Sequence, residues 1–520
     1  MKSSVVLFLG FSILVANAGE NLVANSGFEM GTNGWRAWSR DVGVLTTSLD
    51  SQEIHSGRFA LRLVHHGQKD WSVEPAVLLD VQPGDIVRLE CWVKAQGSGS
   101  VSLCASTWDK EGRVISWSAG DQTASAPAFW QHLGTRVIAT ENARQFQPRL
   151  IGYGPSEVWL DDFLAAREGN LSQLRAANLP GHLVVSNQVL AVDFNTRDAN
   201  FSARDLRVNR TWEQKAFSSR FVVRTATVQS NQIQSLVFDA ITGAELGMVA
   251  QLDSDLPEMT LVLSGHGECP SSIPLPHPFA SAAGDYLVIP MNEGISYPVD
   301  DASISPMRLI AYGGHGICMG FYGVTDGSRG HMAILETPDD AAIRIDRIDG
   351  RLVVAPEWDS RLGQFGYARR IRYVFLDRGG HVAMAKRYRR YATEIGLRKT
   401  LSEKRAGNPN IDRLVGAVNV WCWERDSVGI VKEMQALGID RILWSNQQPP
   451  ERLRELNDLG VLTSRYDIYQ DVMAPTNFPR VRWIHPDWTT NAWPQDIIVN
   501  RRGDWLRGWG VEARDGSLIP

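Results

Sequence analysis

Short runs in which apolar and polar residues alternate recur along the first third of the chain. They include "RFALRLVHH", "IVRLECWVKA", "SVSLCAST" and "EVWLDDFLA", and turn sequences such as "QPGD" and "QGSG" separate them. Alternation with a period of two is typical of strands that bury one face. Short strands at regular spacing predict an all-β sandwich or jelly roll over residues 21–169.

The same alternation continues through residues 179–407, in runs such as "MTLVLSG", "YLVIPM" and "RRIRYVFLD". Few helical patterns interrupt it, so we expect a large antiparallel β-sandwich. The segment closes with a predicted helix, "GHVAMAKRYRRYATEIG", whose apolar stripe is Met384, Tyr388, Tyr391 and Ile395. We interpret the basic residues of this helix as a solvated face, because the chain as a whole is not basic and has a net charge of −5.

The period changes after residue 411. Strand-like "RLVGAVNVWCW" is followed by the helical pattern "SVGIVKEMQALG", which Asp426 can cap and Gly438 can end. Pro450 opens a second helix, and a third strand, "VLTSRYDIYQDV", follows it. Strand–helix alternation predicts parallel strands, here the first three units of a (β/α)₈ barrel over residues 411–520. A whole barrel typically needs about 250 residues, so we expect an incomplete barrel and a truncated gene product.

The first twenty residues have the pattern of an export signal. Basic Lys2 precedes an apolar run, and the small residues Ala16 and Ala18 follow it. This predicts a signal peptide over residues 1–18 and a secreted protein, extracellular or periplasmic. A membrane anchor is the weaker alternative because the run is too short to span a bilayer, and no other stretch is longer. The net charge of −5 gives no reason to expect a nucleic-acid partner, and the oligomeric state is left open.

Five cysteines are widely spaced, so a zinc site is not expected. A hairpin turn at "QGSG" would set Cys91 opposite Cys104, which leaves a cross-strand disulfide and two buried thiols as alternatives. P-loop, GxSxG and HExxH motifs do not occur in the sequence, and we expect no organic cofactor.

Eighteen tryptophans are unevenly distributed: eight lie within residues 21–169, eight within 411–520 and two between. Indole rings suit the apolar faces of sugars, although core packing is the alternative for any single ring. Strand alternation places Trp92 in the core, and Trp35 is expected to be structural. The rings expected to contact sugar stand in polar surroundings near turns; they are Trp38, Trp71, Trp108 and Trp117.

Four motifs in order resemble carbohydrate-binding modules of families 4 and 9. They are "NLVANSGFEMGTNGW", "HSGRFALRL", "VQPGDIVRLECWVKA" and "VWLDDFLA". The resemblance covers residues 21–169 and implies a galactose-binding-like jelly roll that binds a polysaccharide or glycoprotein glycan. It also implies a structural Ca²⁺ held by Glu29 and by Asp161 or Asp162, since hard oxygen ligands suit this ion. Solvated turn carboxylates are the alternative.

A long sandwich followed by a helix and then βα units resembles the architecture of family 101 glycoside hydrolases, the endo-α-N-acetylgalactosaminidases. This resemblance implies a multidomain protein: a jelly roll, a β-supersandwich and the start of a (β/α)₈ barrel. In such barrels the chemistry lies at the carboxyl ends of the strands. The residues at those ends that suit a sugar site are Trp423, Glu424, Asn446, Tyr466, Asp467 and Asp471.

Glycoside hydrolysis needs two carboxylates, and the candidates are Glu424, Asp467 and Asp471. We expect a glycoside hydrolase that binds glycans, with the possibility that the catalytic carboxylates lie on later strands. The alternative is a non-catalytic carbohydrate-binding surface or scaffold protein. In that case the polar residues at the strand ends only anchor loops.

Overall fold

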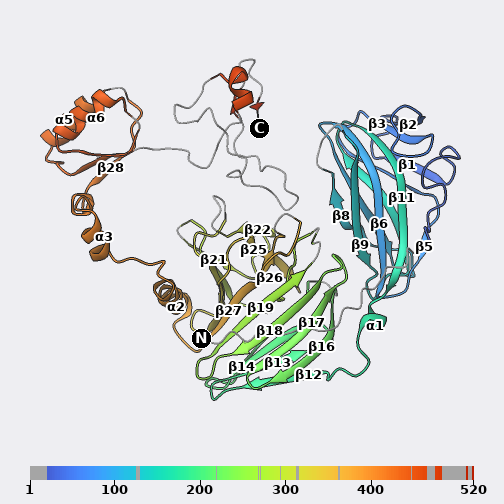
Figure 1. The fold of residues 1–520 in the computed structure, drawn as a ribbon, viewed down its shortest axis with the longest axis horizontal. Helices are drawn as coiled ribbons and strands as arrows, with labels where there is room; N and C mark the ends of the chain where they lie inside the picture. The colour runs from blue at the N-terminus through green and yellow to red at the C-terminus, as the bar shows by residue number, and fades with distance from the viewer. Residues whose placement is uncertain are drawn as a thin grey trace. The chain divides into compact units, whose positions relative to one another are not determined.

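The structure, a computed structural model, divides into two compact units, residues 1–381 and 382–520. It describes residues 20–124, 129–217, 220–266, 269, 271–292, 294–311, 316–360, 363–424, 426–446, 448–464, 475–482, 511–512 and 518–519. Most of the first unit consists of antiparallel sheets (Figure 1). Among the described residues, no helix has both the length and the apolar character needed to cross a bilayer.

Two antiparallel sheets build the N-terminal β-sandwich. The first, in spatial order, is β1 (Trp35–Ser39), β4 (Asp70–Pro75), β10 (Gln145–Tyr153), β7 (Ser100–Trp108) and β8 (Val114–Thr123), with β5 (Leu79–Asp80) also paired to β10. The second is β2 (Leu45–Asp50), β3 (Ala60–His65), β11 (Ser156–Asn170), β6 (Asp85–Gly97) and β9 (Gln131–Ile138). One core joins both sheets, including Leu63, Leu103 and Leu150. The predicted all-β character of this region is confirmed.

A larger group of sheets follows helix α1 (Leu171–Leu174). A four-stranded sheet contains β12 (His182–Ser186), β13 (Leu190–Asn195), β14 (Asn200–Asp205) and β15 (Arg210–Glu213). A nine-stranded sheet runs in the order β16 (Phe221–Gln229), β17 (Gln232–Asp239), β18 (Glu245–Leu252), β19 (Glu258–His266), β27 (Arg369–Leu376), β24 (Gly330–Leu335), β23 (Phe321–Thr325), β20 (Tyr286–Ile289) and β21 (Ile295–Pro298). A three-stranded sheet contains β22 (Met307–Ile310), β25 (Ala341–Ile348) and β26 (Arg351–Trp358).

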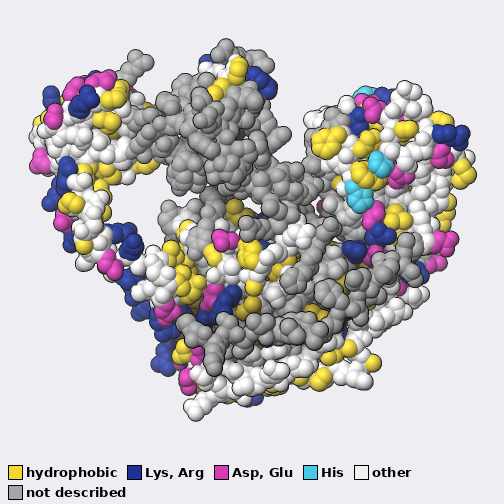
Figure 2. Space-filling view, in the orientation of Figure 1, with side chains coloured by type: hydrophobic (Ala, Val, Ile, Leu, Met, Phe, Trp, Pro, Cys, Tyr) yellow, Lys and Arg dark blue, Asp and Glu magenta, His cyan; other side chains and the backbone are white. Residues whose placement is uncertain are grey.

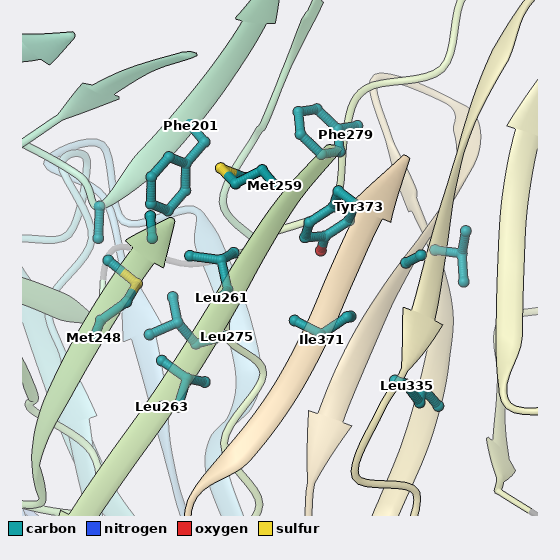
Figure 3. Packing of buried hydrophobic residues seen from close by; sticks show 14 of the residues in the cluster. Phe201, Met248, Met259, Leu261, Leu263, Leu275, Phe279, Leu335, Ile371 and Tyr373 are labelled. Atoms are coloured by element: carbon teal, nitrogen blue, oxygen red, sulfur yellow. The ribbon is translucent and has the colours of Figure 1, made fainter. Parts of the chain in front are cut away.

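The three sheets share one apolar core. Phe201 comes from the four-stranded sheet, and Met259, Leu261 and Tyr373 come from the nine-stranded sheet, where Figure 3 shows them packed from neighbouring strands. Since every second residue of β19 and β27 points into this core, the residues between them face outward. The predicted antiparallel sandwich is therefore present. The face of the nine-stranded sheet that points away from the core carries polar side chains.

The second unit contains helices and a small parallel sheet. Its elements are α2 (Gly380–Glu394), which begins at the boundary, α3 (Leu401–Gly407), α4 (Ile411–Leu414), β28 (Val418–Val420), α5 (Ser427–Ala436), β29 (Ile442–Trp444), α6 (Pro450–Asp458), β30 (Leu462–Thr463), a 3₁₀ turn (Pro475–Arg480), β31 (Val511–Glu512) and β32 (Leu518–Ile519). Strands β28, β29 and β30 pair in parallel. Asp426 caps α5 by accepting from the Gly429 amide at 3.0 Å, as predicted. The strand–helix alternation is present; its assignment to the first three units of an incomplete (β/α)₈ barrel stays a prediction.

The predicted hairpin that would pair Cys91 with Cys104 is wrong. Strands β6 and β7 belong to different sheets, so Cys91 lies opposite Leu133 on β9 and Cys104 opposite Arg149 on β10. The turn between them is a corner where the chain changes sheets. Both thiols are free and buried, and burial raises the pKa of Cys104 to about 12. The alternative of two buried thiols holds.

The prediction that Trp92 lies in the core is also wrong. On β6 the inward positions are Leu89, Cys91 and Val93, so Trp92 lies on the outer face of its sheet. There its ring stacks on the His55 imidazole, with centroids 3.9 Å apart. Figure 2 shows histidine side chains together on the visible face of this sandwich, beside apolar and acidic side chains. The sequence predicted the strand correctly but assigned Trp92 to the wrong face of the sheet.

Candidate functional site

A row of charged side chains crosses the outer face of the six-stranded sheet. Arg36 on β1 lies directly opposite Glu74 on β4, and Arg149 on β10 lies opposite Cys104 on β7. Arg36 Nε donates to Glu74 Oε1 at 2.9 Å, and Arg149 Nε lies 3.4 Å from Glu74 Oε2. One carboxylate therefore sits between two guanidinium groups from neighbouring strands. A charged group held by partners of opposite charge keeps a fixed position.

Amide and hydroxyl groups extend this network on the same face. Arg36 Nη2 donates to Gln147 Oε1 at 2.9 Å, and Gln147 Nε2 donates to the Pro75 carbonyl at 2.6 Å. Arg149 Nη1 donates to Ser106 Oγ at 3.1 Å. Although these side chains lie on the outer face, Gln147 and Ser106 are fully buried. They form a floor whose hydrogen-bonding groups are oriented before any ligand arrives.

Two exposed tryptophans stand at opposite edges of this floor. Trp38 on edge strand β1 is 47% exposed, and Trp117 on edge strand β8 is 63% exposed. The Arg40 guanidinium lies 5.8 Å from the Trp38 ring, and the Arg149 guanidinium lies 5.9 Å from the Trp117 ring. Trp108 supports Trp117 edge-on, with ring centroids 6.3 Å apart. The structure thus brings three of the four predicted sugar-contact rings onto one face.

The fourth predicted ring, Trp71, does not reach this face, and its assignment as a sugar contact is wrong. On β4 it alternates with outward Ser72 and Glu74, and it is 1% exposed in the core. Its ring packs on Gly152 of the neighbouring strand, where an added Cβ would lie 2.3 Å from a ring carbon. The polar residues around Trp71 in the sequence suggested a turn, whereas they belong to strand β4, and one of them, Glu74, is part of the floor.

The sequence analysis missed the polar floor itself. Its five members come from four different strands; they are Arg36, Glu74, Ser106, Gln147 and Arg149. The sequence carries one signal for Glu74, because "WSVEP" alternates strictly, with one apolar residue, Val73, between the polar Ser72 and Glu74. Which strands become neighbours cannot be read from that alternation.

The three carboxylates predicted to hold calcium bind the chain segment at residues 55–59. Glu29 accepts from the amides of Arg58 and Phe59, and these hydrogen bonds lower its pKa. Asp161 Oδ2 accepts from the amides of His55 and Ser56 at 3.0 Å each.

Asp162 completes this set, since its two oxygens contact the His55 ring and the Ser56 hydroxyl. Gly57 has φ +64° and lies so close to Glu29 that a Cβ would be 2.2 Å from the carboxylate. No group of three or more metal-ligating side chains gathers around one point within the described residues. Each of the three carboxylates already accepts hydrogen bonds from protein donors, and a calcium ion shared by them stays a prediction.

The candidate sugar residues of the second unit lie at the carboxyl ends of parallel strands. Trp423 and Glu424 follow β28, and Asn446 follows the neighbouring β29. Asn446 Nδ2 donates to the Cys422 carbonyl at 2.8 Å, which joins the two strand ends.

Aromatic surface is exposed at this edge. Trp421 and Trp423 are 51% and 66% exposed, and their rings stack with centroids 6.1 Å apart and planes 26° apart. Glu424 is exposed beside them. The other candidates, Tyr466, Asp467 and Asp471, lie outside the described residues, so the structure shows one candidate carboxylate of the two that hydrolysis needs.

Comparison with known proteins gives distant similarities. No protein-family model matches the sequence, and no curated protein matches it. Among solved structures, the α-N-acetylgalactosaminidase NagBb from Bifidobacterium bifidum is similar over 62% of this chain, with 16% identity and a TM-score of 0.47. The chain spans 63% of the length of NagBb.

Two carbohydrate-binding modules are similar over shorter parts of the chain. TmCBM61, solved with β-1,4-galactotriose, has 21% identity and a TM-score of 0.22, covering 28% of this chain and 99% of the module. The CBM22-1 xylan-binding domain of Xyn10C from Paenibacillus barcinonensis has 16% identity and a TM-score of 0.24, covering 29% of this chain and 97% of the domain. Similarities this distant do not assign an activity, so the functional argument rests on the chain's own residues.

Proposed function

We propose that the N-terminal β-sandwich binds a glycan chain along the outer face of its six-stranded sheet. The observation that carries the proposal is the oriented polar floor between two exposed tryptophans, Trp38 and Trp117. Indole rings offer apolar surface to the C–H faces of sugars at little entropic cost. The half-exposed Arg36 guanidinium offers donors to sugar hydroxyl groups, and the buried members of the floor hold it in place.

The spacing of the strands favours an extended chain over a single sugar. Trp38 and Trp117 lie on the two edge strands, with three strands between them. Four spacings of about 4.8 Å separate the edges, which gives roughly 19 Å across the sheet. A single sugar ring cannot contact both indoles over that distance. The ligand we propose is therefore an oligosaccharide stretch of a polysaccharide or a glycoprotein glycan.

The test is affinity electrophoresis of the full chain through gels that contain soluble galactan, xylan, mixed-linkage glucan or mucin. We expect at least one of these glycans to retard the chain, and Trp38→Ala with Trp117→Ala to abolish the retardation. Phe129→Ala is the matched control, because Phe129 is also 63% exposed but lies outside the strands of the six-stranded sheet. Unretarded migration in every gel contradicts the proposal.

We further propose that the whole protein is a secreted glycoside hydrolase, with its sugar site at the strand ends of the second unit. The exposed Trp421–Trp423 pair beside Glu424 supports this proposal, because a sugar subsite needs an aromatic platform next to a carboxylate. Glu424 would be one of the two carboxylates that hydrolysis requires, with Asp467 or Asp471 as the proposed second.

A non-catalytic glycan-binding scaffold is the second candidate, and the solvent-exposed position of Glu424 favours it. A general acid usually needs a raised pKa, which burial supplies. Assays with aryl glycosides and mucin glycopeptides separate the two. Turnover that Glu424→Gln abolishes supports the hydrolase; glycan binding without turnover supports the scaffold.

A further inference from the structure

The outer face of the nine-stranded sheet carries a second ordered row of polar side chains. Gln232 on β17 lies opposite Gln251 on β18, Gln251 lies opposite Thr260 on β19, and Thr260 lies opposite Arg372 on β27. The register therefore places four hydrogen-bonding side chains in one line across four adjacent strands. Three strand spacings of about 4.8 Å make this line roughly 14 Å long.

A groove of about 400 Å³ lies along this row. Its lining includes Asn231, Gln251, Ser254, Thr260, Arg370 and Arg372. Ligand pockets in proteins typically have volumes of about 300–1,000 Å³, so this groove has room for a small molecule. It lies on a different sheet and a different sandwich from the face that holds Trp38 and Trp117.

Two buried carboxylates fix the arginines of the groove. Arg372 Nε lies 2.5 Å from Glu336 Oε1, Arg372 Nη1 lies 3.2 Å from Glu258 Oε2, and Arg370 also binds Glu336. The side chains of Glu336 and Glu258 are 9% and 3% exposed. Paired guanidinium groups keep their orientation and offer their remaining N–H donors to the groove.

The charge balance disfavours an anionic ligand. Two arginines stand against three carboxylates, because Asp253 also lines the groove. An added negative charge would meet a site that is already negative by one unit. A neutral ligand avoids this repulsion and can still use the guanidinium, amide and hydroxyl groups.

We propose that this groove binds a neutral, hydroxyl-rich sugar unit. Sugar hydroxyls both donate and accept hydrogen bonds, which suits a lining of guanidinium, amide and hydroxyl groups. The groove offers no aromatic ring among its lining residues, so hydrogen bonds carry the binding. The site is separate from the face proposed above and does not depend on it.

The experiment uses the full chain with Trp38→Ala and Trp117→Ala, so that the outer face of the six-stranded sheet no longer binds glycan. Saturation-transfer NMR is recorded with galactose, glucose and N-acetylgalactosamine, and with galacturonate and inorganic sulfate as anionic probes. We expect a saturable signal from at least one neutral sugar. Adding Gln251→Ala and Thr260→Val is expected to raise its Kd about tenfold, since each removed hydrogen bond contributes modestly.

Ser264→Ala is the matched control, because Ser264 lies on the same face of β19 but outside the groove. Its variant should bind like the parent chain. Gln251→Ala alone, at an exposed position, should weaken binding without affecting folding. Absence of signal from all three neutral sugars, signal from galacturonate or sulfate only, or signal unchanged by the groove substitutions overturns the proposal. Failure of the outer face of the six-stranded sheet to bind glycan is read separately, from the chain without tryptophan substitutions.

Discussion

Glu74 and Arg149 meet on the outer face of the six-stranded sheet, with Arg149 Nε 3.4 Å from Glu74 Oε2 and each side chain 11% exposed. The carboxylate also binds Arg36, so a single glutamate pairs with two cations, one on each strand beside its own. Removing one partner of such a pair leaves the other charge without compensation in a poorly hydrated place. The position of the whole polar floor therefore depends on Glu74.

Glu74→Ala should lower both stability and glycan binding. Arg36 is 53% exposed and can regain water, whereas Arg149 cannot, so we expect a loss of about 2 kcal/mol in the free energy of unfolding. Urea titration measures this loss, and affinity electrophoresis measures binding. Glu157→Ala is the control, because Glu157 pairs with Arg62 at a more exposed site and should cost less than about 1 kcal/mol. Equal losses in both variants contradict the assignment of a special role to Glu74.

Trp71 and Trp117 should respond to alanine in opposite ways. Trp71 is buried against Gly152, so Trp71→Ala leaves a cavity and should cost about 3–5 kcal/mol of unfolding free energy. Trp117 is largely exposed, so its loss should change stability by less than about 0.5 kcal/mol. It should weaken glycan binding on the order of 1–3 kcal/mol, the cost of an aromatic hot spot. Unfolding curves of the two variants measure stability, and electrophoresis in the glycan that retards the parent chain measures binding. A Trp71→Ala chain as stable as the parent contradicts the prediction.

Trp71 and Trp92 show how much of this structure the sequence pattern predicts. Alternation located the strands, and the capping signal of Asp426 located the start of α5. The sequence predicted the wrong face for Trp92, which lies between inward Cys91 and Val93 and stacks on His55 outside the core. It predicted a sugar contact at Trp71 from polar neighbours near a turn, whereas Trp71 is buried. A pattern of period two does not state which face meets the core when both faces carry large side chains.

The second limit of the sequence-based prediction is that it does not show which strands become neighbours in a sheet. The turn after Cys91 looked like a hairpin, yet the chain crosses there from one sheet to the other. Which strands pair is decided by packing over the whole sandwich, and the sequence between two strands does not record it. For the same reason Arg36 and Gln147, which are 111 positions apart and share a hydrogen bond, could not be joined from the sequence.

Calcium provides the third prediction. Glu29, Asp161 and Asp162 already accept hydrogen bonds from residues 55–59. We therefore expect the melting temperature to be unchanged by excess EDTA and by added calcium. Glu29→Gln should lower it, because Glu29 anchors the amides of Arg58 and Phe59. A rise in melting temperature with calcium, following mass action for a ligand of the folded state, would instead restore the calcium site implied by the family resemblance.

His331 makes the stability of the larger sandwich depend on pH. It is 1% exposed on β24, against the rings of Phe279 and Trp212, and its Nδ1 has no hydrogen-bond partner in the described structure. Desolvation disfavours the imidazolium and lowers the pKa of His331 from 6.5 to about 3. The Arg210 guanidinium adds a smaller effect in the same direction.

The sign of the effect follows from proton binding. Below pH 6.5 the unfolded chain protonates this histidine, while the folded chain keeps it neutral until about pH 3. The unfolded state therefore binds more protons in this window, and stability falls as the pH falls, by about 1.4 kcal/mol per pH unit for one histidine. His331→Leu should flatten the pH dependence between pH 6.5 and 3 by this slope. Urea titrations at successive pH values measure it, and His182→Leu, at a surface position 61% exposed, should leave the slope unchanged. Burial also lowers the pKa of His277, to about 4, so a weaker slope from His277 should remain in His331→Leu. If the slope in His331→Leu equals that of the parent chain, His331 is not a group that titrates.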